Sequence, residues 1–442
     1  CIFGAFLSTF GVGDFMFKLS KKATNGLVAS TAKTAIAFST FMGMISGTAA
    51  GNVAVTGSLT IPMMNKSGYK RHESAAVEAV ASTGGQIMPP IMGAAAFIMA
   101  EMTSTEYNVI MKSAIIPAIL FFSSIYIIVH LISLRDNIDT GVNRDDEDSN
   151  ILSLIKSDGY LLFPIITLIL FMVTGYSPLK SALYSIGIML ILHLIVKREF
   201  SKTFLVKVYS AIVDGAKSTM LISIACGVSG IIVGVISITG VGSKLSSIII
   251  DASGGNLFIA LLLTMVTSII LGMGLPTTAA YLIPVSVIAP ALVQMGVPLL
   301  TAHMFIFLFA CVSTITPPVA LASYVAAGIS EANINKVGWT GFRFATASYI
   351  LPFMLVYSPA IMLSGDILSN ILAVISGFVT IYCIAVSIVG YFNKKLSNAF
   401  RIAMLVIGLA IVKNNMVSNI MSLIIFTVLT YSSLKNKGVK NE

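Results

Sequence analysis

The sequence has little charge: 10% of its 442 residues are Asp, Glu, Lys or Arg, whereas 56% are hydrophobic. Soluble domains carry about 25% charged residues, so a chain this apolar has too few polar groups to cover a surface in water. Several apolar runs approach or reach the roughly 20 residues that cross a bilayer as a helix. They are Ile115–Ile132, Leu161–Val173, Leu257–Leu271, Phe344–Leu363 and Ile371–Val389. The sequence therefore predicts an all-α polytopic membrane protein in a lipid bilayer.

Other scarce features exclude further classes of protein. The four cysteines (Cys1, Cys226, Cys311 and Cys383) stand far apart without a CxxC pair, which argues against a metal site or a disulfide framework. No GxxxxGK[ST] phosphate loop occurs, so a nucleotide-driven pump is not expected. The net charge of +9 comes from basic residues in loops between apolar spans, so it indicates membrane orientation, not a nucleic-acid partner. We expect no catalytic residues and no organic cofactor.

What the sequence does contain is an internal repeat. Gly43-Met44 recurs as Gly272-Met273, an offset of 229 residues (43 to 272), and Pro89-Pro90 recurs as Pro317-Pro318, an offset of 228 (89 to 317). Thr48 recurs as Thr277 at the first of these offsets. Self-similarity at a nearly constant offset is the signature of a duplicated structural unit.

Each copy contains a pair of apolar arms and an interrupted span. In the first copy, Val28–Ile45 and Val53–Met64 flank a polar connection, and the second arm is too short to cross a bilayer, which predicts a re-entrant hairpin. Ser74–Met99 is long enough to cross, but Pro89-Pro90 removes backbone donors and should break the helix within the membrane. The corresponding segments of the second copy are the arms Leu257–Leu271 and Ala279–Val293 and the broken span Thr301–Ala327.

The spans between the two copies predict their relative orientation. An odd number of crossings separates them, so the second copy should be inverted relative to the first, as in many secondary transporters. All basic residues except Lys112, Lys180, Lys244 and Lys413 then fall on one side, which the positive-inside rule makes the cytoplasm. The first hairpin should enter from the cytoplasm and the second from outside, with their tips meeting near the midplane.

The chain divides as follows: a first inverted repeat (1–134), a charged cytoplasmic loop (135–158), a connecting helical pair with a basic loop (159–217), a second inverted repeat (218–364) and C-terminal helices (365–442). Cys1–Phe17 is expected to be the end of one spanning helix, and Gly341–Leu363 a single span. The acidic run Asp145–Asp148 is expected to be solvated, with a metal site as the alternative. Because the chain begins at Cys1 within an apolar run and without Met, we expect residues before it.

The interruptions are the candidate functional site. Irregular backbone at membrane depth leaves polar groups without partners, which is tolerated where it is buried in protein or lines a wet cavity. Carbonyl and hydroxyl oxygens can replace the water around Na⁺, and half-helix N-termini suit an anion. For any single Ser, Thr or Gly, close helix packing is the simpler explanation. The doubled set favours ion and substrate binding: Ser46, Thr48, Asn52, Gly85, Met88 and Pro89 in the first copy, and Gly274, Thr277, Thr278, Ser313, Thr316 and Pro317 in the second.

The scarcity of membrane carboxylates bears on the coupling ion. Proton relays usually use intramembrane Asp, Glu or His. Glu78 is the nearest candidate, but its place near the start of its helix predicts an interfacial position, and Glu101 falls near the outer end of the same span. The four histidines (His72, His130, His193 and His303) fall near helix ends and are expected at the interface. Coupling to Na⁺ through neutral oxygens is therefore favoured over coupling to H⁺.

At these motifs the chain resembles a known family. The strings are ISGTAAGN at Ile45–Asn52, TGGQIMPP at Thr83–Pro90, LGMGLPTTAA at Leu271–Ala280 and TITPP at Thr314–Pro318. They resemble the large membrane subunit of tripartite ATP-independent periplasmic (TRAP) transporters, most of all the branch with fused large and small membrane subunits that works with TAXI-type binding proteins. The resemblance extends from Phe3 to about Leu363.

The resemblance implies an elevator-type secondary transporter with two sodium sites. One would fall on Ser46, Thr48, Gly85, Met88 and Pro89, and the other on Gly274, Thr277, Thr278, Ser313 and Thr316. The second copy has Ser313 where the first has Gly85, so the sites need not be equivalent. For the organic anion we expect contacts from Asn52, Gly84, Pro90, Pro317 and Pro318.

The expected function is Na⁺-coupled import of a small carboxylate across the bacterial inner membrane. The resemblance implies an extracytoplasmic substrate-binding protein as a partner, and a small membrane subunit that is either a separate chain or fused upstream of Cys1. A stand-alone Na⁺/dicarboxylate symporter without a binding protein is the alternative, and a passive channel is a third reading.

Overall fold

The computed structural model describes residues 1–139, 151–198, 201–413, 420–421, 424–425 and 427–428. Within them the fold is helical apart from one pair of two-residue strands, β1 (Tyr391–Phe392) and β2 (Lys394–Lys395). Six helices of this part are long and apolar enough to cross a membrane, and a bent N-terminal pair makes a seventh if it counts as one span. The prediction of an all-α polytopic membrane protein is therefore confirmed. The acidic run Asp145–Asp148 and much of the last C-terminal segment (417–431) lie outside the described residues.

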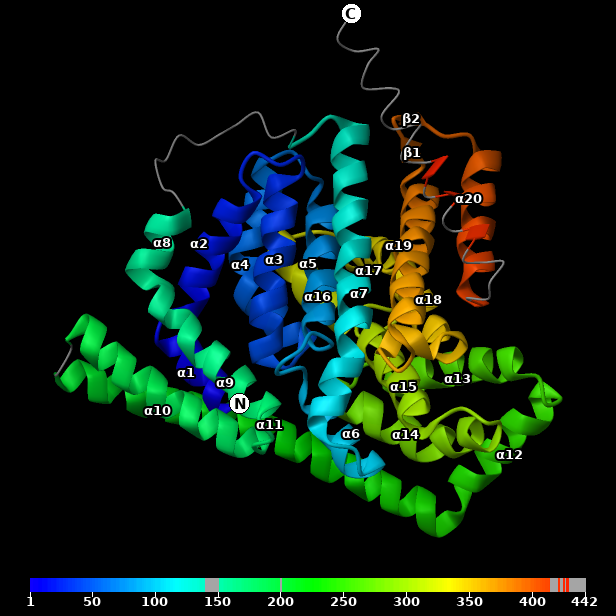
Figure 1. Cartoon of the computed structure of the whole chain (residues 1–442), viewed down its shortest axis with the longest axis horizontal. Coiled ribbons are helices and arrows are strands. Elements are labelled where there is room, and N and C mark those ends of the chain that lie inside the picture. The colour runs from blue at the N-terminus through cyan, green and yellow to red at the C-terminus, as the bar shows by residue number, and fades with distance from the viewer. Residues whose placement is uncertain (140–150, 199–200, 414–419, 422–423, 426, 429–442) are drawn as a thin grey trace, which may run out of the picture.

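The first half of the chain forms an upright bundle (Figure 1). Its helices are α1 (Ile2–Thr9), α2 (Val12–Thr24), α3 (Ser30–Ser46), α4 (Ala49–Lys66), α5 (Arg71–Gly85), α6 (Ala94–Thr103) and α7 (Tyr107–Asp136). Helices α3, α4 and α5 pack against one another, and α5 also contacts α7. The expectation that Cys1–Phe17 belongs to one continuous helix is wrong, because α1 and α2 are separate helices that meet at 68°. The bend lies at Gly11, whose φ of +86° is one that glycine adopts without a side-chain penalty.

A middle section connects the two halves. It consists of α8 (Ile151–Asp158), the 3₁₀ turn η1 (Gly159–Leu162), α9 (Phe163–Val173), α10 (Pro178–Lys197) and the long α11 (Lys202–Thr239). Helices α10 and α11 run obliquely along the base of the molecule in Figure 1, and α1 packs against both. Large apolar side chains such as Leu205, Ile231 and Ile238 are exposed on α11, as expected of a helix that faces lipid.

The second half begins with α12 (Val241–Ser253), α13 (Leu257–Gly272), α14 (Thr277–Gln294), α15 (Leu299–Ser313), α16 (Leu321–Ser330), α17 (Ile334–Phe344), α18 (Thr346–Tyr357) and η2 (Pro359–Met362). The expected single span Gly341–Leu363 is therefore wrong, since α17, α18 and η2 divide it. The chain then continues through α19 (Ile367–Val389), α20 (Asn398–Ala410) and η3 (Ile411–Lys413). Asp366 caps α19, and hydrogen bonding to Ser369 lowers the pKa of its carboxyl group.

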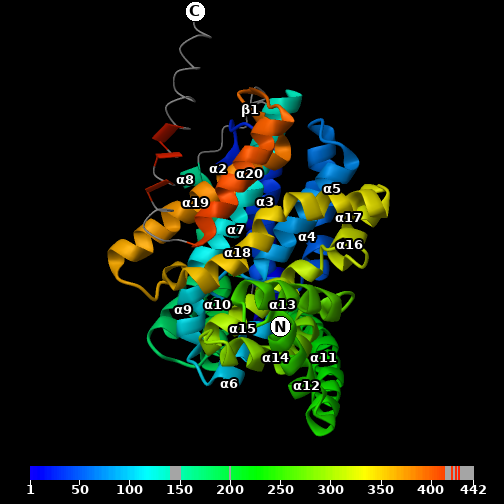
Figure 2. The ribbon, with the colours of Figure 1, turned by 90° about the vertical axis from the view of Figure 1, so that its right-hand side faces the viewer.

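The two halves exchange the second segments of their interrupted helices. Helix α16, which follows α15, packs on α4 and α5 of the first half, and α6, which follows α5, packs on α14 and α15 of the second half. Figure 2 shows α16 and α17 beside α4 and α5, and α6 below α14 and α15. Every residue from Glu73 to Gly85 of α5 and from Thr301 to Ser313 of α15 is buried. The exchange therefore brings the two interruptions together in the core.

Candidate functional site

The first hairpin turns over two residues. Helix α3 ends at Ser46 and α4 begins at Ala49, with Gly47 at φ +69° and Thr48 extended. The hydroxyl of Ser46 donates to the carbonyl of Thr48 across this turn (3.3 Å). The predicted connection up to Asn52 is too long, because α4 starts earlier and has 18 residues. The length argument for a re-entrant second arm therefore fails, although the hairpin itself is present.

The second hairpin has a similar but longer turn. Helix α13 ends at Gly272 and α14 begins at Thr277, with Gly274 at φ +74° between them. Thr277 and Thr278 are the first two residues of α14, and both are buried. Their backbone N–H groups belong to the first turn of a helix, which has no intrahelical acceptors for its donors and carries partial positive charge.

The two interrupted helices end in the same way. In each, two backbone N–H groups donate to carbonyls three residues earlier, and a further bond closes the loop. The bonds of the first interruption are Ile87 to Gly84 (3.0 Å), Met88 to Gly85 (3.3 Å) and Gly93 to Gln86 (2.9 Å). Those of the second are Ile315 to Val312 (3.1 Å), Thr316 to Ser313 (3.2 Å) and Ala322 to Thr314 (3.0 Å). The Pro89-Pro90 and Pro317-Pro318 peptide bonds, one in each loop, are both cis.

Each hairpin touches the interruption of its own half at equivalent positions. In the first half, a Cβ atom added to Gly85 would lie 2.4 Å from the Cα atom of Gly43. In the second half, the hydroxyl of Ser313 donates to the carbonyl of Gly272 (3.3 Å). Small residues allow this close approach of backbones between membrane helices. The sequence difference between Gly85 and Ser313 thus changes a backbone contact into a hydrogen bond.

Gln86 joins the tips of the two hairpins. In the amide orientation that satisfies both of its polar atoms, its nitrogen donates to Thr277 Oγ1 (2.5 Å) and to the Gly47 carbonyl (3.3 Å). Its oxygen accepts from the Ala49 N–H (3.2 Å). One fully buried side chain therefore bonds to both turns. Gln86 was missed as a site residue, although it stands alone as an amide in the TGGQIMPP string.

A second contact joins the interruptions themselves. The hydroxyls of Thr83 on α5 and Thr314 after α15 lie 3.2 Å apart, and both side chains are buried. Ser46, Thr48 and Gly85 are thus placed in one region with Thr277 and Ser313. Sequence reasoning had expected the two tips to meet, and these contacts agree with that expectation.

Other predicted residues have different surroundings. Asn52 is fully buried, and its amide nitrogen donates inside the first bundle to the Ser39 carbonyl and Ser82 Oγ. Gly84 faces α7, since an added Cβ atom would lie 2.5 Å from the ring of Phe121. In the described residues, the contacts of Asn52 and Gly84 are with the first half of the chain and not with the second hairpin.

The remaining predicted residues lie in or beside the interruption loops. Thr316 Oγ1 lies 2.5 Å from the hydroxyl of Tyr349 on α18. The Pro90 carbonyl accepts from Tyr107 (3.0 Å), and the Pro318 carbonyl accepts from Tyr324. Met88 and Pro89 follow Gln86 in the first loop, and Pro317 packs near Gly338 of α17.

The placement of the titratable residues needs correction. Glu78 was expected at the interface, but it is fully buried between α3, α4 and α5. His303 is also buried, with its ring nitrogen 2.7 Å from the Tyr281 hydroxyl, and His193 packs edge-on against Phe10. The expectation that Glu78 is interfacial, on which the preference for Na⁺ over H⁺ partly rests, is therefore wrong, because this carboxyl group is enclosed by protein.

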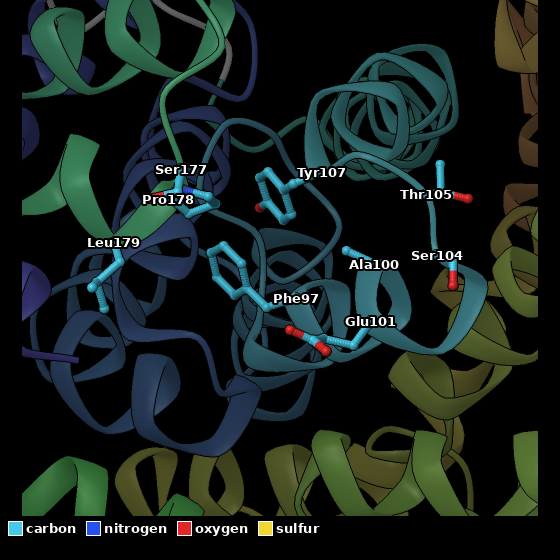
Figure 3. Close-up of a pocket in the computed structure, with 9 residues that line it drawn as sticks. All are labelled: Phe97, Ala100, Glu101, Ser104, Thr105, Tyr107, Ser177, Pro178 and Leu179. Atoms are coloured by element: carbon cyan, nitrogen blue, oxygen red, sulfur yellow. The ribbon is translucent and has the colours of Figure 1, made fainter.

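A cavity of about 790 Å³ lies beside the first interruption, between α6, the start of α7 and the start of α10 (Figure 3). Phe97 and Tyr107 stack on one side of it, and Leu179 lies on another. Tyr107 also donates to the carbonyls of Pro90 and Ile91, so this ring separates the cavity from the first loop. None of the predicted sodium ligands lines this cavity.

Comparison with known proteins gives one family. A family model described as "Tripartite ATP-independent periplasmic transporter, DctM component" matches residues 1–365. The "Isethionate TRAP transporter permease protein DctMQ" of Oleidesulfovibrio alaskensis is 22% identical over 362 residues, which are 81% of this chain and 55% of that protein. The "Putative TRAP transporter large permease protein" of Haemophilus influenzae is 22% identical over 329 residues, 74% of this chain and 76% of that protein.

A third relative has a different substrate in its name. The "C4-dicarboxylate TRAP transporter large permease protein DctM" of Pseudomonas aeruginosa is 19% identical over 361 residues, 82% of this chain and 83% of that protein. The chain thus spans about half the length of the Oleidesulfovibrio relative and most of the length of the other two.

Proposed function

The chain belongs to the DctM-component family of tripartite ATP-independent periplasmic transporters, and we propose that it is a Na⁺-coupled secondary transporter that imports a small carboxylate. The family is one of transporter permeases and not an enzyme class. With its apolar helices, the chain is a multi-pass protein of the inner membrane. The sodium ion, the carboxylate and the partners below are parts of the proposal.

The observation that carries the proposal is the meeting of the two hairpin turns with the two helix interruptions. Gln86 bonds to both hairpin turns, and Thr83 and Thr314 meet between the two broken helices. Turns and loops in the core leave carbonyl and N–H groups that a regular helix would pair internally. Such groups, together with Ser and Thr hydroxyls, are the neutral ligands suited to Na⁺ and to an anion.

Two sodium sites are proposed, one in each half. The first uses Ser46 and Thr48 at the hairpin turn with Gly85, Met88 and Pro89 at the interruption. The second uses Gly274, Thr277 and Thr278 with Ser313 and Thr316. Support comes from the contacts that place turn and interruption side by side in each half. The organic anion would bind between the sites, beside the proline pairs.

We further propose that the two halves are inverted repeats that move as an elevator. Support comes from the paired turns, the matched loop hydrogen bonds and the reciprocal exchange of α6 and α16. In such a mechanism the hairpins and broken helices carry the cargo past a fixed scaffold, which here would include α7 and α19.

The partners follow from the family. We propose that an extracytoplasmic binding protein delivers the substrate and that a small membrane subunit completes the permease. The name DctMQ and the greater length of the Oleidesulfovibrio relative support a fused small subunit in that protein, and by analogy either a fused or a separate one here. Two of the relatives are named for isethionate and for C4-dicarboxylates, so these anions are the first substrates to test in transport assays.

Two other functions remain to be separated by experiment. A stand-alone Na⁺/dicarboxylate symporter would accumulate substrate without a binding protein, so omission of the binding protein distinguishes it. A passive channel would not accumulate substrate at all. Sodium-driven accumulation of a labelled C4-dicarboxylate in proteoliposomes supports the proposal, and equilibration without accumulation contradicts it. Accumulation of isethionate, a sulfonate, in place of the dicarboxylate would support the sodium coupling and contradict the carboxylate as substrate.

The sodium ligands can be tested without a known substrate. Ser46→Ala and Thr278→Ala each remove one proposed oxygen ligand, so each should raise the Na⁺ concentration for half-maximal thermal stabilisation about tenfold, or about 1.4 kcal/mol. The measurement is the melting temperature of the purified protein as Na⁺ replaces choline at constant ionic strength. Ser58→Ala and Thr239→Ala make the same changes at exposed positions and should leave the sodium dependence unchanged. An unaltered sodium dependence in both site variants would remove these two residues from the proposed sites.

A further inference from the structure

Glu78 on α5 is a carboxyl group surrounded by hydroxyls. Its side chain has no exposed surface, and its Oε1 atom accepts from Ser39 (2.6 Å), Thr56 (2.5 Å) and Ser82 (2.9 Å). Its Oε2 atom accepts from Thr60 (2.6 Å). The donors come from α3, α4 and α5, so the carboxyl group lies where the three helices of the first bundle meet.

In the described part of the chain, no cationic side chain forms an ion pair with this carboxyl group. The charged or titratable side chains of the helices that pack on α5 lie elsewhere. On α3 and α4 they are Lys33, which lies over the Tyr126 ring of α7 beside His130, and exposed Lys66. On α17, α16 and α15 they are exposed Lys336 and Arg343, Tyr324, buried Cys311, and His303 beside Tyr281. On α7 they are Tyr107, which donates to the carbonyls of Pro90 and Ile91, exposed Lys112, and Arg135 paired with Asp136. Half-buried His72 stands in the first turn of α5. On α5 itself, Glu73 pairs with Lys70 and Arg71 with Glu331. An ionised Glu78 would therefore be a buried charge with no countercharge, which is costly at membrane depth.

A proton fits this place better than a metal ion. The carboxyl oxygens are in direct contact with the hydroxyls at 2.5 to 2.9 Å, so a cation bound between them would have to push the helices apart. A proton needs no such space.

The hydroxyl network can bond to either protonation state. Thr56 Oγ1 also lies 2.8 Å from the Asn52 carbonyl, and Thr60 Oγ1 lies 3.0 Å from the Thr56 carbonyl. Each hydroxyl has one proton to donate and lone pairs to accept with. When Glu78 is ionised, the hydroxyls donate to it. When Glu78 is protonated, its O–H donates to Thr60, which in turn donates to the Thr56 carbonyl. Neither state leaves the carboxyl group without partners.

The same network reaches the first hairpin turn. Ser82 Oγ accepts from the Asn52 amide nitrogen (3.0 Å), which also donates to the Ser39 carbonyl (2.9 Å). Asn52 begins the second turn of α4 after the hairpin tip, and its amide oxygen is buried without a hydrogen-bond partner. A Cβ atom added to Gly43, which contacts Gly85, would lie 3.1 Å from the Asn52 amide nitrogen. A change at Glu78 is therefore two hydrogen bonds away from the contact between hairpin and interruption.

We propose that Glu78 is a proton-binding site and that the transport cycle carries its proton. This rests on the proposed function as a secondary transporter. Glu78 takes up H⁺ from the outer solution, crosses as a neutral carboxylic acid within the first bundle, and releases H⁺ to the cytoplasm. The proton accompanies the sodium ions and the anion, and no redox or covalent step is involved.

The first experiment tests protonation without any substrate. Infrared difference spectroscopy of the reconstituted full chain between acid and alkaline buffer should show the C=O band of a protonated carboxylic acid in an apolar environment. Glu78→Gln should remove that band, and Glu101→Gln, at an exposed position, should retain it. Absence of the band from the unsubstituted protein at every pH at which the protein stays folded, or its persistence in Glu78→Gln, overturns the proposal.

The second experiment tests coupling. Proteoliposomes receive a fixed Na⁺ gradient, a clamped membrane potential and a labelled C4-dicarboxylate or isethionate with its binding protein. If one proton is carried per substrate, the steady-state accumulation ratio of the unsubstituted protein should rise about tenfold for each unit of imposed pH gradient. A ratio that does not respond to the pH gradient overturns the proposal whatever the variant does.

The Glu78→Gln variant tests whether Glu78 is the residue that carries the coupled proton. Glu78→Gln should make the accumulation ratio independent of the pH gradient, while its melting temperature shows that it is folded. If accumulation in the variant keeps the same dependence, the proton site is elsewhere and the proposal is wrong. If neither anion is accumulated by any protein, the proposed transport function has failed for these substrates, and the infrared band still decides whether Glu78 binds a proton.

Discussion

Gln86→Leu is expected to lower the initial rate of sodium-driven uptake at least about tenfold while leaving the helices folded. Leucine fills a similar volume but removes the bonds from Gln86 to Thr277 Oγ1, the Gly47 carbonyl and the Ala49 N–H. Each buried polar group left without a partner costs about 1–3 kcal/mol. Because these groups belong to both hairpin turns, the loss should separate the two tips and lower the initial uptake rate at least about tenfold.

The matched control for this variant is the chain's other glutamine. Gln294 is exposed at the end of α14, so Gln294→Leu makes the same chemical change away from the tips. Uptake is measured in proteoliposomes, together with the sodium-dependent rise in melting temperature. If Gln86→Leu retains both properties at the level of Gln294→Leu, Gln86 does not hold the tips together in the way its contacts suggest.

Gly85→Ala is expected to have the largest effect on stability of the glycine-to-alanine changes in the described residues. The new Cβ atom would lie 2.4 Å from the Cα atom of Gly43 and 2.8 Å from its carbonyl carbon. Because both are backbone atoms, the clash cannot be relieved by a side-chain rotation, and α3 and α5 must move apart. Overpacking of this kind costs about 1–3 kcal/mol or more. The melting temperature should fall, and sodium should no longer raise it.

Gly187→Ala is the control for the same addition. Gly187 lies on α10 with open space where its Cβ atom would be, and alanine favours a helix over glycine by about 1 kcal/mol. Its melting temperature should be unchanged or slightly raised. A Gly85→Ala protein as stable as this control, with its sodium response intact, would show that the close approach of α3 and α5 is not required.

The interruptions were predictable from sequence because glycine and proline act locally. Pro89-Pro90 and Pro317-Pro318 cannot continue a helix, and both do lie between helices, α5 and α6 in one case and α15 and α16 in the other. The hairpin turns were found from their small and polar residues. Their exact ends were not, since α4 begins at Ala49, three residues before Asn52, where the connection was expected to end.

Features that depend on distant partners were not predictable. Glu78 looked interfacial because it stands near the start of the predicted span Ser74–Met99, yet α3 and α4 supply most of the hydroxyls that surround it. Gln86 was overlooked because its partner Thr277 lies in the other half of the chain. The bend at Gly11 was hidden because the residues on both sides of it are apolar. For Glu78 and Gln86 a long-range contact decides the role, and the local sequence pattern does not contain it.

The most direct test of the account is a cryo-EM structure of the protein in sodium chloride compared with one in choline chloride. The account predicts that the turns around Gly47 and Gly274 meet across Gln86. It also predicts sodium-dependent density at two places, beside Ser46, Thr48 and Gly85 and beside Thr277, Thr278 and Ser313. Proline pairs far apart from each other, or sodium bound away from both interruptions, would contradict it.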